Sequence, residues 1–360
     1  MKTRVVVGMS GGVDSSVAAA LLQQQGYDVV GATLLLAPES ETAGQTPVSE
    51  SAARSAQAVC ERLGIEWRLV ERREFFAEQV IRPFCDEYAR GRTPNPCVVC
   101  NRRVKFPLLV ETARALGAAY VATGHYARVV KEGERFVLRR GLDESKDQSY
   151  ALFDLDPAVL PQVLMPLGER RKSDVRRLAA ELDLPVHDRP ASQDACFVAD
   201  GHYGDLLQRY SGVAPEPGPI YDLDGNRLGE HKGVQLYTVG QRRGLGISAP
   251  EPLYVVEIDA ARNVLIVGPG SALDADSLIA RSPSWISIAP PTKPFDALVK
   301  IRYNHAGAMG TVSILDENAV RVEFHEPVRA ITPGQACVFY GGSGAARDLV
   351  LGGAWIEGRA

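Results

Sequence analysis

Hydrophobic and polar residues alternate along about the first 200 positions in the rhythm of an α/β protein. Four runs rich in β-branched residues are predicted strands: "RVVVG", "DVVGATLLL", "IEWRLVE" and "AAYVATGHY". Helical patterns lie between and after them, at residues 14–25, 49–63, 75–89 and 103–116. Glycines end three of these segments, as is typical of helix C-termini: Gly26, Gly64 and Gly117. Strands that alternate with helices predict a parallel, doubly wound sheet with helices on both faces.

The pattern changes after about residue 215. Pro and Gly cluster in "GVAPEPGPIYDLDGN", and short strands separated by turns follow, such as "LYVVEID", "ALVKIRY" and "AVRVEF". This texture predicts a small connecting domain followed by a β-barrel. We expect the domains to span residues 1–205, 206–278 and 279–360.

Composition limits the possible functions without naming one. The chain is 45% hydrophobic and has no apolar run near the ~18 residues of a membrane span, so we expect no membrane partner. Six cysteines in 360 residues do not resemble a secreted disulfide scaffold, which favours a cytoplasmic, reducing location. The net charge of -4 gives no global attraction for nucleic acid. A polyanion would have to meet local basic segments such as "NRRVK", "LRRG" and "ERRKSDVRR".

The stretch "VVVGMSGGVDSS" places a glycine-rich turn where doubly wound folds bind ligands, at the carboxyl end of the first strand. Ser10, Gly11, Gly12 and Ser15 offer backbone and hydroxyl donors to an anion, and the next helix adds positive partial charge. The lysine of the G-x-x-x-x-G-K-[ST] pattern is missing. Asp14 beside a phosphate needs a cation, so we expect Mg²⁺ to bridge Asp14 and the phosphates.

Cysteines stand out in two further motifs. "TPNPCVVCNRRVKF" holds Cys97 and Cys100 between a rigid proline loop and a helix, and "SQDACFV" holds Cys196. A helix N-terminus and nearby cations lower the pKa of a thiol, which is expected to activate Cys100. A C-x-x-C pair alone is compatible with zinc, redox chemistry or a nucleophile, but structural zinc usually needs two such pairs. The other three cysteines are expected in the core: Cys60, Cys85 and Cys337.

Eight motifs, in order, resemble the tRNA-specific 2-thiouridylase (MnmA) family over nearly the whole chain. They are "GMSGGVDSS", "TPNPCVVCNRRVKF", "ATGHYAR", "KDQSYALF", "MPLGERRKSDVR", "SQDACFV", "YTVGQRRGLG" and "KIRYNH". The first also resembles the loop of the N-type ATP pyrophosphatases, which split ATP between the α and β phosphates. The resemblance implies an ATP pyrophosphatase domain of the adenine nucleotide α-hydrolase type, a central domain and a C-terminal β-barrel. It also implies a sulfurtransferase that adenylates the carbon-2 oxygen of a tRNA wobble uridine and then delivers persulfide sulfur, giving 2-thiouridine, AMP and pyrophosphate.

The resemblance assigns roles to individual positions. ATP binding falls to Gly8, Met9, Ser10, Gly11, Gly12, Val13, Asp14, Ser15, Leu34 and Gly124. Contacts with tRNA fall to Asn95, Pro96, Cys97, His125, Lys146, Asp147, Gln148, Arg302, Tyr303 and Gln335. Cys100 is the implied nucleophile and Cys196 the persulfide carrier, and the two are expected to form a transient disulfide. Cys97 replaces an aspartate of well-known relatives, which puts the acid/base role of that position in doubt.

The implied partners are a tRNA, with lysine, glutamate or glutamine acceptors expected by resemblance, and a sulfur donor. The donor is expected to be a cysteine desulfurase or a sulfur relay protein. The wobble base must leave its stack to reach ATP, and Tyr126 or Tyr150 is expected either to support it or to pack in the core.

Three alternatives stay open. Cys97, Cys100 and Cys196 are also a possible ligand set for a [4Fe–4S] cluster whose fourth iron carries the sulfur. A different ATP pyrophosphatase, such as an amidating ligase, usually needs an ammonia source, and the sequence shows no obvious glutaminase domain. A tRNA-binding protein without catalysis is disfavoured by the intact ATP loop.

Overall fold

The computed structural model describes residues 2–38, 48–188, 195–198 and 203–360, and these form two compact units. The first unit comprises Met1–Gln79, Cys97–Phe197 and Asp348–Val350. The second comprises Val80–Pro96, Val198–Arg347 and Leu351–Ala360. The chain therefore passes between the units several times, and each unit is built from segments distant in sequence.

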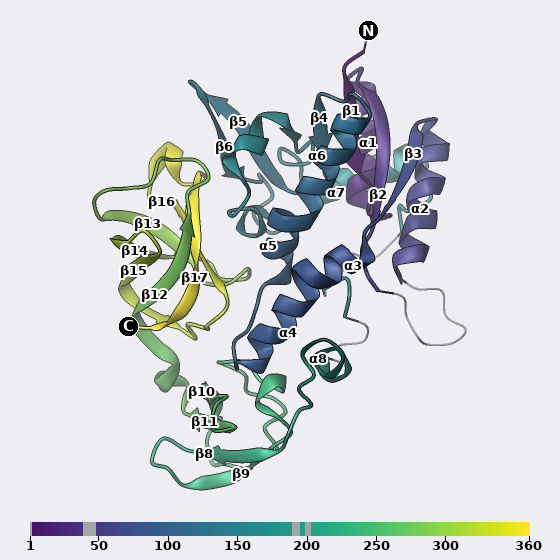
Figure 1. The fold of residues 1–360 in the computed structure, drawn as a ribbon. Helices are drawn as coiled ribbons and strands as arrows, with labels where there is room; N and C mark the ends of the chain where they lie inside the picture. The colour runs from purple at the N-terminus through teal and green to yellow at the C-terminus, as the bar shows by residue number, and fades with distance from the viewer. Residues whose placement is uncertain (1, 39–47, 189–194, 199–202) are drawn as a thin grey trace. The chain divides into compact units, whose positions relative to one another are not determined.

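A five-stranded parallel sheet forms the centre of the first unit (Figure 1). Its order is β3-β2-β1-β4-β7. The strands are β1 Arg4–Gly8, β2 Asp28–Leu35, β3 Glu66–Glu71, β4 Tyr120–Ala122 and β7 Val163–Leu164. All four pairings are parallel, which confirms the predicted sheet. The order reverses direction between β1 and β4, and doubly wound sheets bind their ligands at such a point.

Helices cover both faces of this sheet. The helices α1 (Val13–Gln24), α2 (Val48–Leu63) and α7 (Lys172–Glu181) share one hydrophobic core with Val5 and Val7 of β1. Successive strand side chains point to opposite faces, and a Cβ at Gly8 would meet Leu109 of α6 (Phe106–Ala115) at 3.1 Å. The helix α6 therefore packs on the other face, as predicted.

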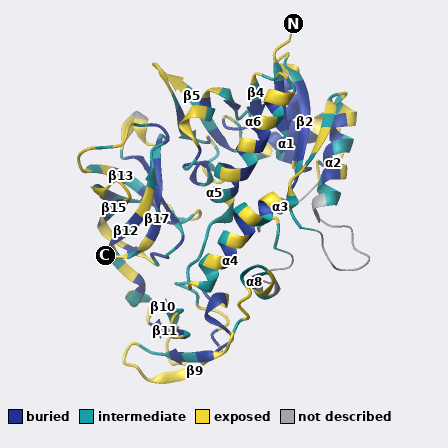
Figure 2. Cartoon of the chain, in the orientation of Figure 1, coloured by how far each residue is buried: buried dark blue, intermediate teal, exposed yellow. Residues whose placement is uncertain are grey.

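The three glycines predicted to end helices do so. Gly26, Gly64 and Gly117 have φ values of 90°, 65° and 63°, which is the left-handed conformation that closes a helix without a Cβ clash. Figure 2 shows β2 as largely buried, whereas α2 and α6 carry exposed residues.

Two predicted helices are interrupted by π-helical turns. The segment predicted at 75–89 consists of α3 (Arg73–Phe76), a π turn (Ala77–Ile81) and α4 (Arg82–Ala89). The segment predicted from residue 103 begins earlier, with α5 (Pro96–Cys100) and a π turn (Asn101–Lys105) before α6. The expectation that both cysteines precede the helix was wrong, because Pro96 itself starts it, a position that proline favours.

The second unit contains the predicted β-rich region. A four-stranded sheet has the order β10-β11-β8-β9, with β8 Gly218–Tyr221, β9 Arg227–His231, β10 Tyr254–Asp259 and β11 Val264–Gly268. A closed barrel of order β12-β15-β14-β13-β16-β17 follows. Its strands are β12 Asp274–Ser284, β13 Phe295–Lys300, β14 Ala308–Asp316, β15 Ala319–Arg329, β16 Ala336–Gly341 and β17 Val350–Arg359. Closure leaves the sheet no unpaired edge, and the barrel interior is filled by side chains such as Val299, Val322 and Phe339.

Three cysteines belong to the core, as predicted. Cys60, Cys85 and Cys337 are each 0% exposed, and burial raises the pKa of each to about 12. They are inert as nucleophiles at neutral pH. Across the described ranges, no helix has the length and apolar character needed to cross a membrane.

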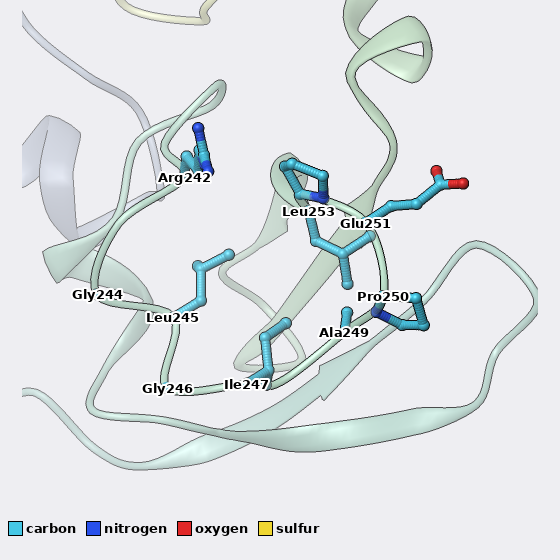
Figure 3. A pocket seen from close by; sticks show the side chains of 10 residues that line it. Arg242, Gly244, Leu245, Gly246, Ile247, Ala249, Pro250, Glu251 and Leu253 are labelled. Carbon is cyan, nitrogen blue, oxygen red and sulfur yellow. The ribbon is translucent and has the colours of Figure 1, made fainter.

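A cavity of about 350 Å³ lies in the second unit, within the segment that contains "GQRRGLG" (Figure 3). Backbone and apolar side chains such as Leu245, Ile247 and Leu253 form much of its wall. Its charged residues are Arg242 and Glu251, which Figure 3 shows on different sides. The wall offers no nucleophile or paired acid and base, so we assign it no chemistry.

Candidate active site

The glycine-rich loop joins β1 to α1 and is fixed by its own contacts. Gly11 has a φ of 72°, and a Cβ there would collide with the carbonyl oxygen of Ala52, so only glycine fits. The backbone N–H of Ser10 donates to Ser15 Oγ at 3.1 Å, and the Ser16 hydroxyl donates to the Gly12 carbonyl at 2.8 Å. Ser15 also donates to that carbonyl, so these buried hydroxyls shape the loop.

The loop's anion-binding capacity therefore comes mainly from its backbone. Gly12 is the N-cap of α1 and has no side chain to occupy the first N–H groups of the helix. A 12-residue helix presents positive partial charge at this end. Ser10 is the one loop serine with an exposed side chain, and its hydroxyl shares a hydrogen bond of 3.2 Å with Ser15 Oγ.

Two further residues of the expected ATP site border the loop. Gly124 follows β4, and a Cβ there would lie 2.7 Å from the Ser15 nitrogen, so the β4 end approaches α1 closely only because it is glycine. Leu34 is the penultimate residue of β2 and is partly exposed. The structure thus brings the loop, Leu34 and Gly124 to the carboxyl edge of three adjacent strands, and their roles in ATP binding stay a prediction.

Asp14 in this loop is bound by two donors from distant elements. Lys172 Nζ, from the first residue of α7, lies 2.6 Å from Asp14 Oδ1. The Tyr126 hydroxyl donates to the same oxygen at 2.8 Å. Burial first, and then the Asp14 charge, raise the pKa of Tyr126, which stays protonated. A lysine ammonium from α7 therefore lies beside a loop whose own sequence has no lysine.

Sequence reasoning missed this arrangement. It placed Lys172 among basic residues that follow tRNA phosphates, and it considered Tyr126 only for base support or core packing. A usable signal existed, because α7 follows β7, and helices that follow parallel strands begin at the same edge of the sheet. Tyr150 is 0% exposed and packs in the core, so it does not support a base.

The three candidate cysteines lie in the first unit and interact electrostatically. Cys97 is exposed and Cys100 is 9% exposed, near the end of α5. Burial raises the pKa of Cys100, Cys97 adds to the rise, and Lys105 opposes it. The expectation of a lowered pKa for Cys100 was wrong, because this thiol lies at the buried end of α5 rather than at its N-terminus.

Cys196 shares the same electrostatic environment. It is an exposed residue, and the partial burial of its thiol is the first cause that raises its pKa, to about 11. Cys100 and Cys97 raise that pKa further, while Lys105 lowers it. All six cysteines are free thiols, so the transient Cys100–Cys196 disulfide stays a prediction.

Lys105 also affects the pKa of His125. Its Nδ1 lies 2.7 Å from Thr123 Oγ1, and its ring stacks on Phe106 with centroids 6.0 Å apart. Burial first, and then Lys105, hold the pKa of His125 well below its ordinary value. The ring is neutral at pH 7, so a contact with tRNA would be a hydrogen bond or stacking rather than an ion pair.

The 146–148 turn has one exposed member. Asp147 is 4% exposed and accepts hydrogen bonds from Arg140 Nε at 2.9 Å and from the Gly141 N–H at 3.1 Å. Gln148 Oε1 accepts the Tyr126 N–H at 3.0 Å. Both side chains support the fold, which leaves exposed Lys146 as the side chain placed to meet a phosphate.

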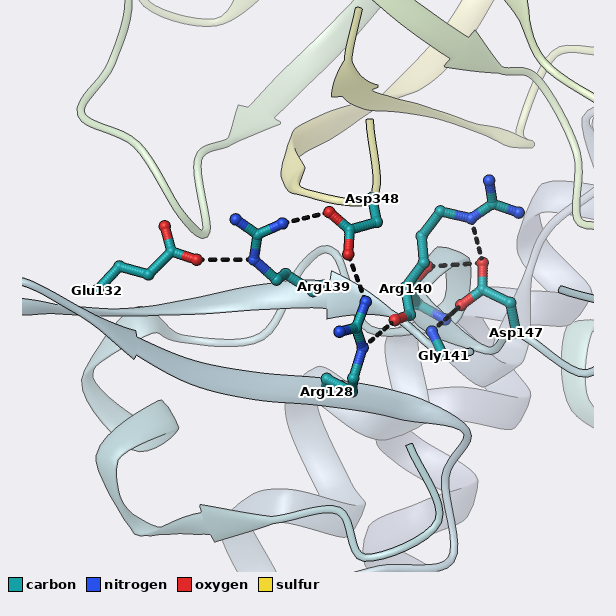
Figure 4. Close-up of polar contacts among 8 residues, drawn as sticks. Arg128, Glu132, Arg139, Arg140, Gly141, Asp147 and Asp348 are labelled. Carbon is teal, nitrogen blue, oxygen red and sulfur yellow. Dashed lines mark hydrogen bonds and ion pairs between the residues drawn. The ribbon is translucent and has the colours of Figure 1, made fainter. Parts of the chain in front are cut away.

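Arginines of the hairpin β5–β6 (Ala127–Glu132 and Arg135–Arg140) are also paired internally. Figure 4 shows Arg128 and Arg139 both reaching Asp348, and Arg139 also binding Glu132. The Arg140 N–H donates to the Asp348 carbonyl at 2.7 Å. The guanidinium groups of Arg139 and Arg140 hold carboxylates of the protein, so the contact of "LRRG" with tRNA phosphates stays a prediction.

The remaining expected tRNA contacts lie in the second unit, apart from Cys97. Gln335 Nε2 donates to the carbonyls of Thr93 and Pro94 at 2.9 and 3.3 Å, and so holds the loop that leads to Asn95 and Pro96. Arg302 donates to the Arg329 carbonyl at 3.0 Å, and Tyr303 is 40% exposed. Tyr303 is therefore accessible, whereas Gln335 has a structural task.

The next question is whether the side chains present could hold a metal ion. In the parts of the chain that the structure describes, no three His, Cys, Asp or Glu side chains lie together closely enough to hold a metal ion. The iron–sulfur alternative on the three cysteines therefore gains no support from their placement. Mg²⁺ does not need three protein ligands, because it is commonly bound by one or two carboxylates plus substrate phosphates. Asp14 is therefore compatible with Mg²⁺ bound together with ATP.

Family comparisons cover nearly the whole chain. Residues 3–200 match the family described as "tRNA methyl transferase HUP domain", residues 204–269 its "PRC-barrel domain", and residues 275–356 an "Aminomethyltransferase beta-barrel domain". The chain is 45% identical to the tRNA-specific 2-thiouridylase MnmA of Desulforamulus reducens, covering 99% of this chain and 98% of that protein. It is 48% identical to the protein of the same name from Geobacter metallireducens, covering 99% and 97%. A solved 4-thiouridine synthetase–RNA complex with bound ATP is 18% identical over 58% of this chain and 50% of that one, with a TM-score of 0.37, too low to carry an argument.

Proposed function

Because the chain belongs to the tRNA-specific 2-thiouridylase family, we propose that it is a sulfurtransferase that makes 2-thiouridine in tRNA. The observation that carries the proposal is full-length identity of 45% or more to relatives of that name, joined to a site in which a phosphate-type loop and three interacting cysteines belong to one compact unit. An anion loop suits activation of an oxygen, and paired thiols suit delivery of sulfur.

The first proposed step is adenylation of the carbon-2 oxygen of a wobble uridine. The oxygen attacks the α phosphorus of ATP and pyrophosphate leaves, which turns a poor leaving group into AMP. The loop backbone and the α1 N-terminus hold the departing pyrophosphate. Leu34 and Gly124 border the nucleotide. Mg²⁺, when bound at Asp14, supplies neutralisation of phosphate charge.

The second proposed step moves sulfur in a balanced exchange. The terminal sulfur of a Cys196 persulfide attacks carbon 2 and AMP departs, leaving tRNA joined to the Cys196 sulfur through an S–S bond. The Cys100 thiolate then attacks the Cys196 sulfur, releases thiolated tRNA and forms the Cys100–Cys196 disulfide. A thiol reductant must reopen this disulfide before a new cycle.

The raised pKa values of the thiols suit the state of the enzyme before the proposed sulfur transfer begins. Burial raises the pKa of Cys100 and Lys105 opposes the rise, so the protonated thiol is the main form before tRNA is loaded. Persulfides ionise more readily than thiols, so loading sulfur on Cys196 itself increases reactivity. We propose a cysteine desulfurase or relay protein as the donor, tRNAs with a wobble uridine as substrates, and the cytoplasm as the location.

Mass spectrometry of tRNA nucleosides tests the function. The protein is incubated with unmodified tRNA, ATP, Mg²⁺ and a persulfide source, with ATP omitted in the control. Appearance of 2-thiouridine with one AMP per sulfur supports the proposal. Transfer of a methyl group from a methyl donor, as the domain descriptions name, with no thiolation would reject it.

A further inference from the structure

We infer that Lys172 is the cation of the glycine-rich loop, supplied from α7, and that it moves from Asp14 to an oxygen of the pyrophosphate when ATP binds. The inference rests on the proposed ATP chemistry but concerns a residue outside the expected ATP site. Its basis is the contact of 2.6 Å between Lys172 Nζ and Asp14 Oδ1, 158 positions apart in the sequence.

A backbone hydrogen bond fixes the position of the Lys172 main chain. Its N–H donates to Asp143 Oδ2 at 2.8 Å, which anchors the first turn of α7. The helix α7 packs against α1, whose N-terminus carries Asp14. The lysine side chain is only 16% exposed. It therefore extends from one helix start to the other under partial cover of protein.

The electrostatics of this position favour an anion that is not part of the protein. Lys172 is the first residue of α7 and its ammonium lies at the start of α1, so it stands near the positive ends of two helices. A cation is disfavoured at such an end, whereas an anion is stabilised there. Asp14 and Asp143 offset part of this cost, and the Asp14 side chain is 35% exposed, so water screens part of the ion pair. The oxygens of a polyphosphate would add negative charge where the two helix ends and the ammonium meet.

Tyr126 stays bound to Asp14 while Lys172 moves to the pyrophosphate. Its hydroxyl and Lys172 bind the same oxygen of Asp14, so Oδ2 receives neither donor. Lys172 Nζ also lies 5.7 Å from the Tyr126 ring centroid, within the range of a cation–π contact. When the lysine leaves, the tyrosine still orients Asp14 toward the expected cation. Asp143 and Arg176 are the other charges near the tyrosine, one of each sign.

A lysine suits the proposed task. Its ammonium is a compact charge on a flexible stem, able to shift from a carboxylate to a nearby phosphate oxygen. At the pyrophosphate it neutralises charge that grows as the bond to the α phosphorus breaks. The P-loop pattern places such a lysine inside the loop, and here a separate helix provides it.

The test compares Lys172→Met with the matched control Arg177→Met. Arg177 lies on the same helix, 68% exposed, and its loss removes the same charge away from Asp14. Inorganic pyrophosphate binding is measured by calorimetry with Mg²⁺, and AMP formation in a single turnover with tRNA. Loss of Lys172 is expected to weaken pyrophosphate binding about tenfold or more, and to slow AMP formation about 10²–10³-fold, as when one transition-state donor is removed. Arg177→Met is expected to leave pyrophosphate binding unchanged.

Lys172→Arg and Lys172→Gln separate charge from folding. The arginine variant is expected to recover much of the pyrophosphate binding, and the glutamine variant to resemble methionine. Thermal melting identifies which variants are folded. Wild-type pyrophosphate binding and AMP formation in folded Lys172→Met or Lys172→Gln would overturn the inference. The binding arm is independent of the proposed function: if the wild type made no AMP with tRNA, that function would fail, while pyrophosphate binding would still decide the role of Lys172.

Discussion

The loop site and the cysteine site belong to the same unit but are prepared in opposite ways. In the loop, hydroxyls hold the backbone in place and Asp14 already has two donors. At the cysteines, burial raises the pKa of Cys100 and Cys196, so both thiols rest in their unreactive form. The buried Asn101 Oδ1, beside Cys100, also lacks a hydrogen-bond partner.

This difference matches the demands of the two proposed steps. Binding a phosphate is fastest and tightest when the donors are already placed, because no reorganisation is needed on arrival. A permanently ionised cysteine, in contrast, would be open to oxidation or would attack the persulfide before tRNA arrives. The π turn Asn101–Lys105 directly after Cys100 is a feature that recurs at functional sites. A preformed loop and protonated thiols are therefore consistent with the proposed order, in which adenylation precedes sulfur transfer.

The largest effects are expected from substitutions in the loop and at the cysteines, compared for AMP release and for thiolation. Asp14→Asn removes the charge that holds Lys172 and serves the expected cation, so AMP release with tRNA should be abolished, as should thiolation. Cys100→Ser and Cys196→Ser should abolish thiolation but leave AMP release, because the loop is intact. Quantifying AMP and 2-thiouridine in the same reactions checks both. Normal turnover of Asp14→Asn would remove Asp14 from the mechanism.

The second largest difference is expected in how the rates of sulfur release and adenylation depend on pH. The folded pKa of Cys100 lies above its ordinary value, so the thiolate is a minor form at neutral pH. Its fraction, and the rate of release from a preformed tRNA–persulfide adduct, should rise about tenfold per unit between about pH 6 and 8. Adenylation should vary much less. Stopped reactions at several pH values measure each step, and a flat release rate would show that Cys100 ionisation does not limit it.

Cys97→Ser should have a small effect if the sulfur carrier is a persulfide. Cys97 is exposed and acts on the other two thiols only by raising their pKa, so its loss should keep thiolation within a few-fold of wild type. In a [4Fe–4S] mechanism this substitution would open the cluster and eliminate thiolation. Thiolation assays on anaerobically purified protein, with iron analysis, distinguish the two. Brown, iron-bearing protein that loses colour and activity in Cys97→Ser would reverse the persulfide assignment.

How far the sequence predicted these sites depended on the range of the interactions. The parallel sheet, the helix ends at Gly26 and Gly64, and the barrel follow from local periodicity and glycine conformation, and they were predicted correctly. The contact between Lys172 and Asp14 joins residues 158 positions apart, and its signal lies in the place of α7 after a parallel strand rather than in the residues around either position. The raised pKa of Cys100 depends on how deeply packing buries it, so charge spacing in the sequence gave the wrong direction.

The smallest effect on chemistry is expected from the ion pairs of the β5–β6 hairpin. Asp348 accepts from both Arg128 and Arg139, which are 19% and 17% exposed. Asp348→Asn leaves Arg128 without this anion and Arg139 with Glu132 alone, so the free energy of unfolding should fall by about 1–3 kcal/mol. Neither the loop nor the cysteines contact this network, so AMP formation and thiolation at 25 °C should stay within about twofold. Urea unfolding measures the first effect, with Asp224→Asn in an exposed turn as the control. Loss of activity in Asp348→Asn without loss of stability would instead link the hairpin to the chemical steps.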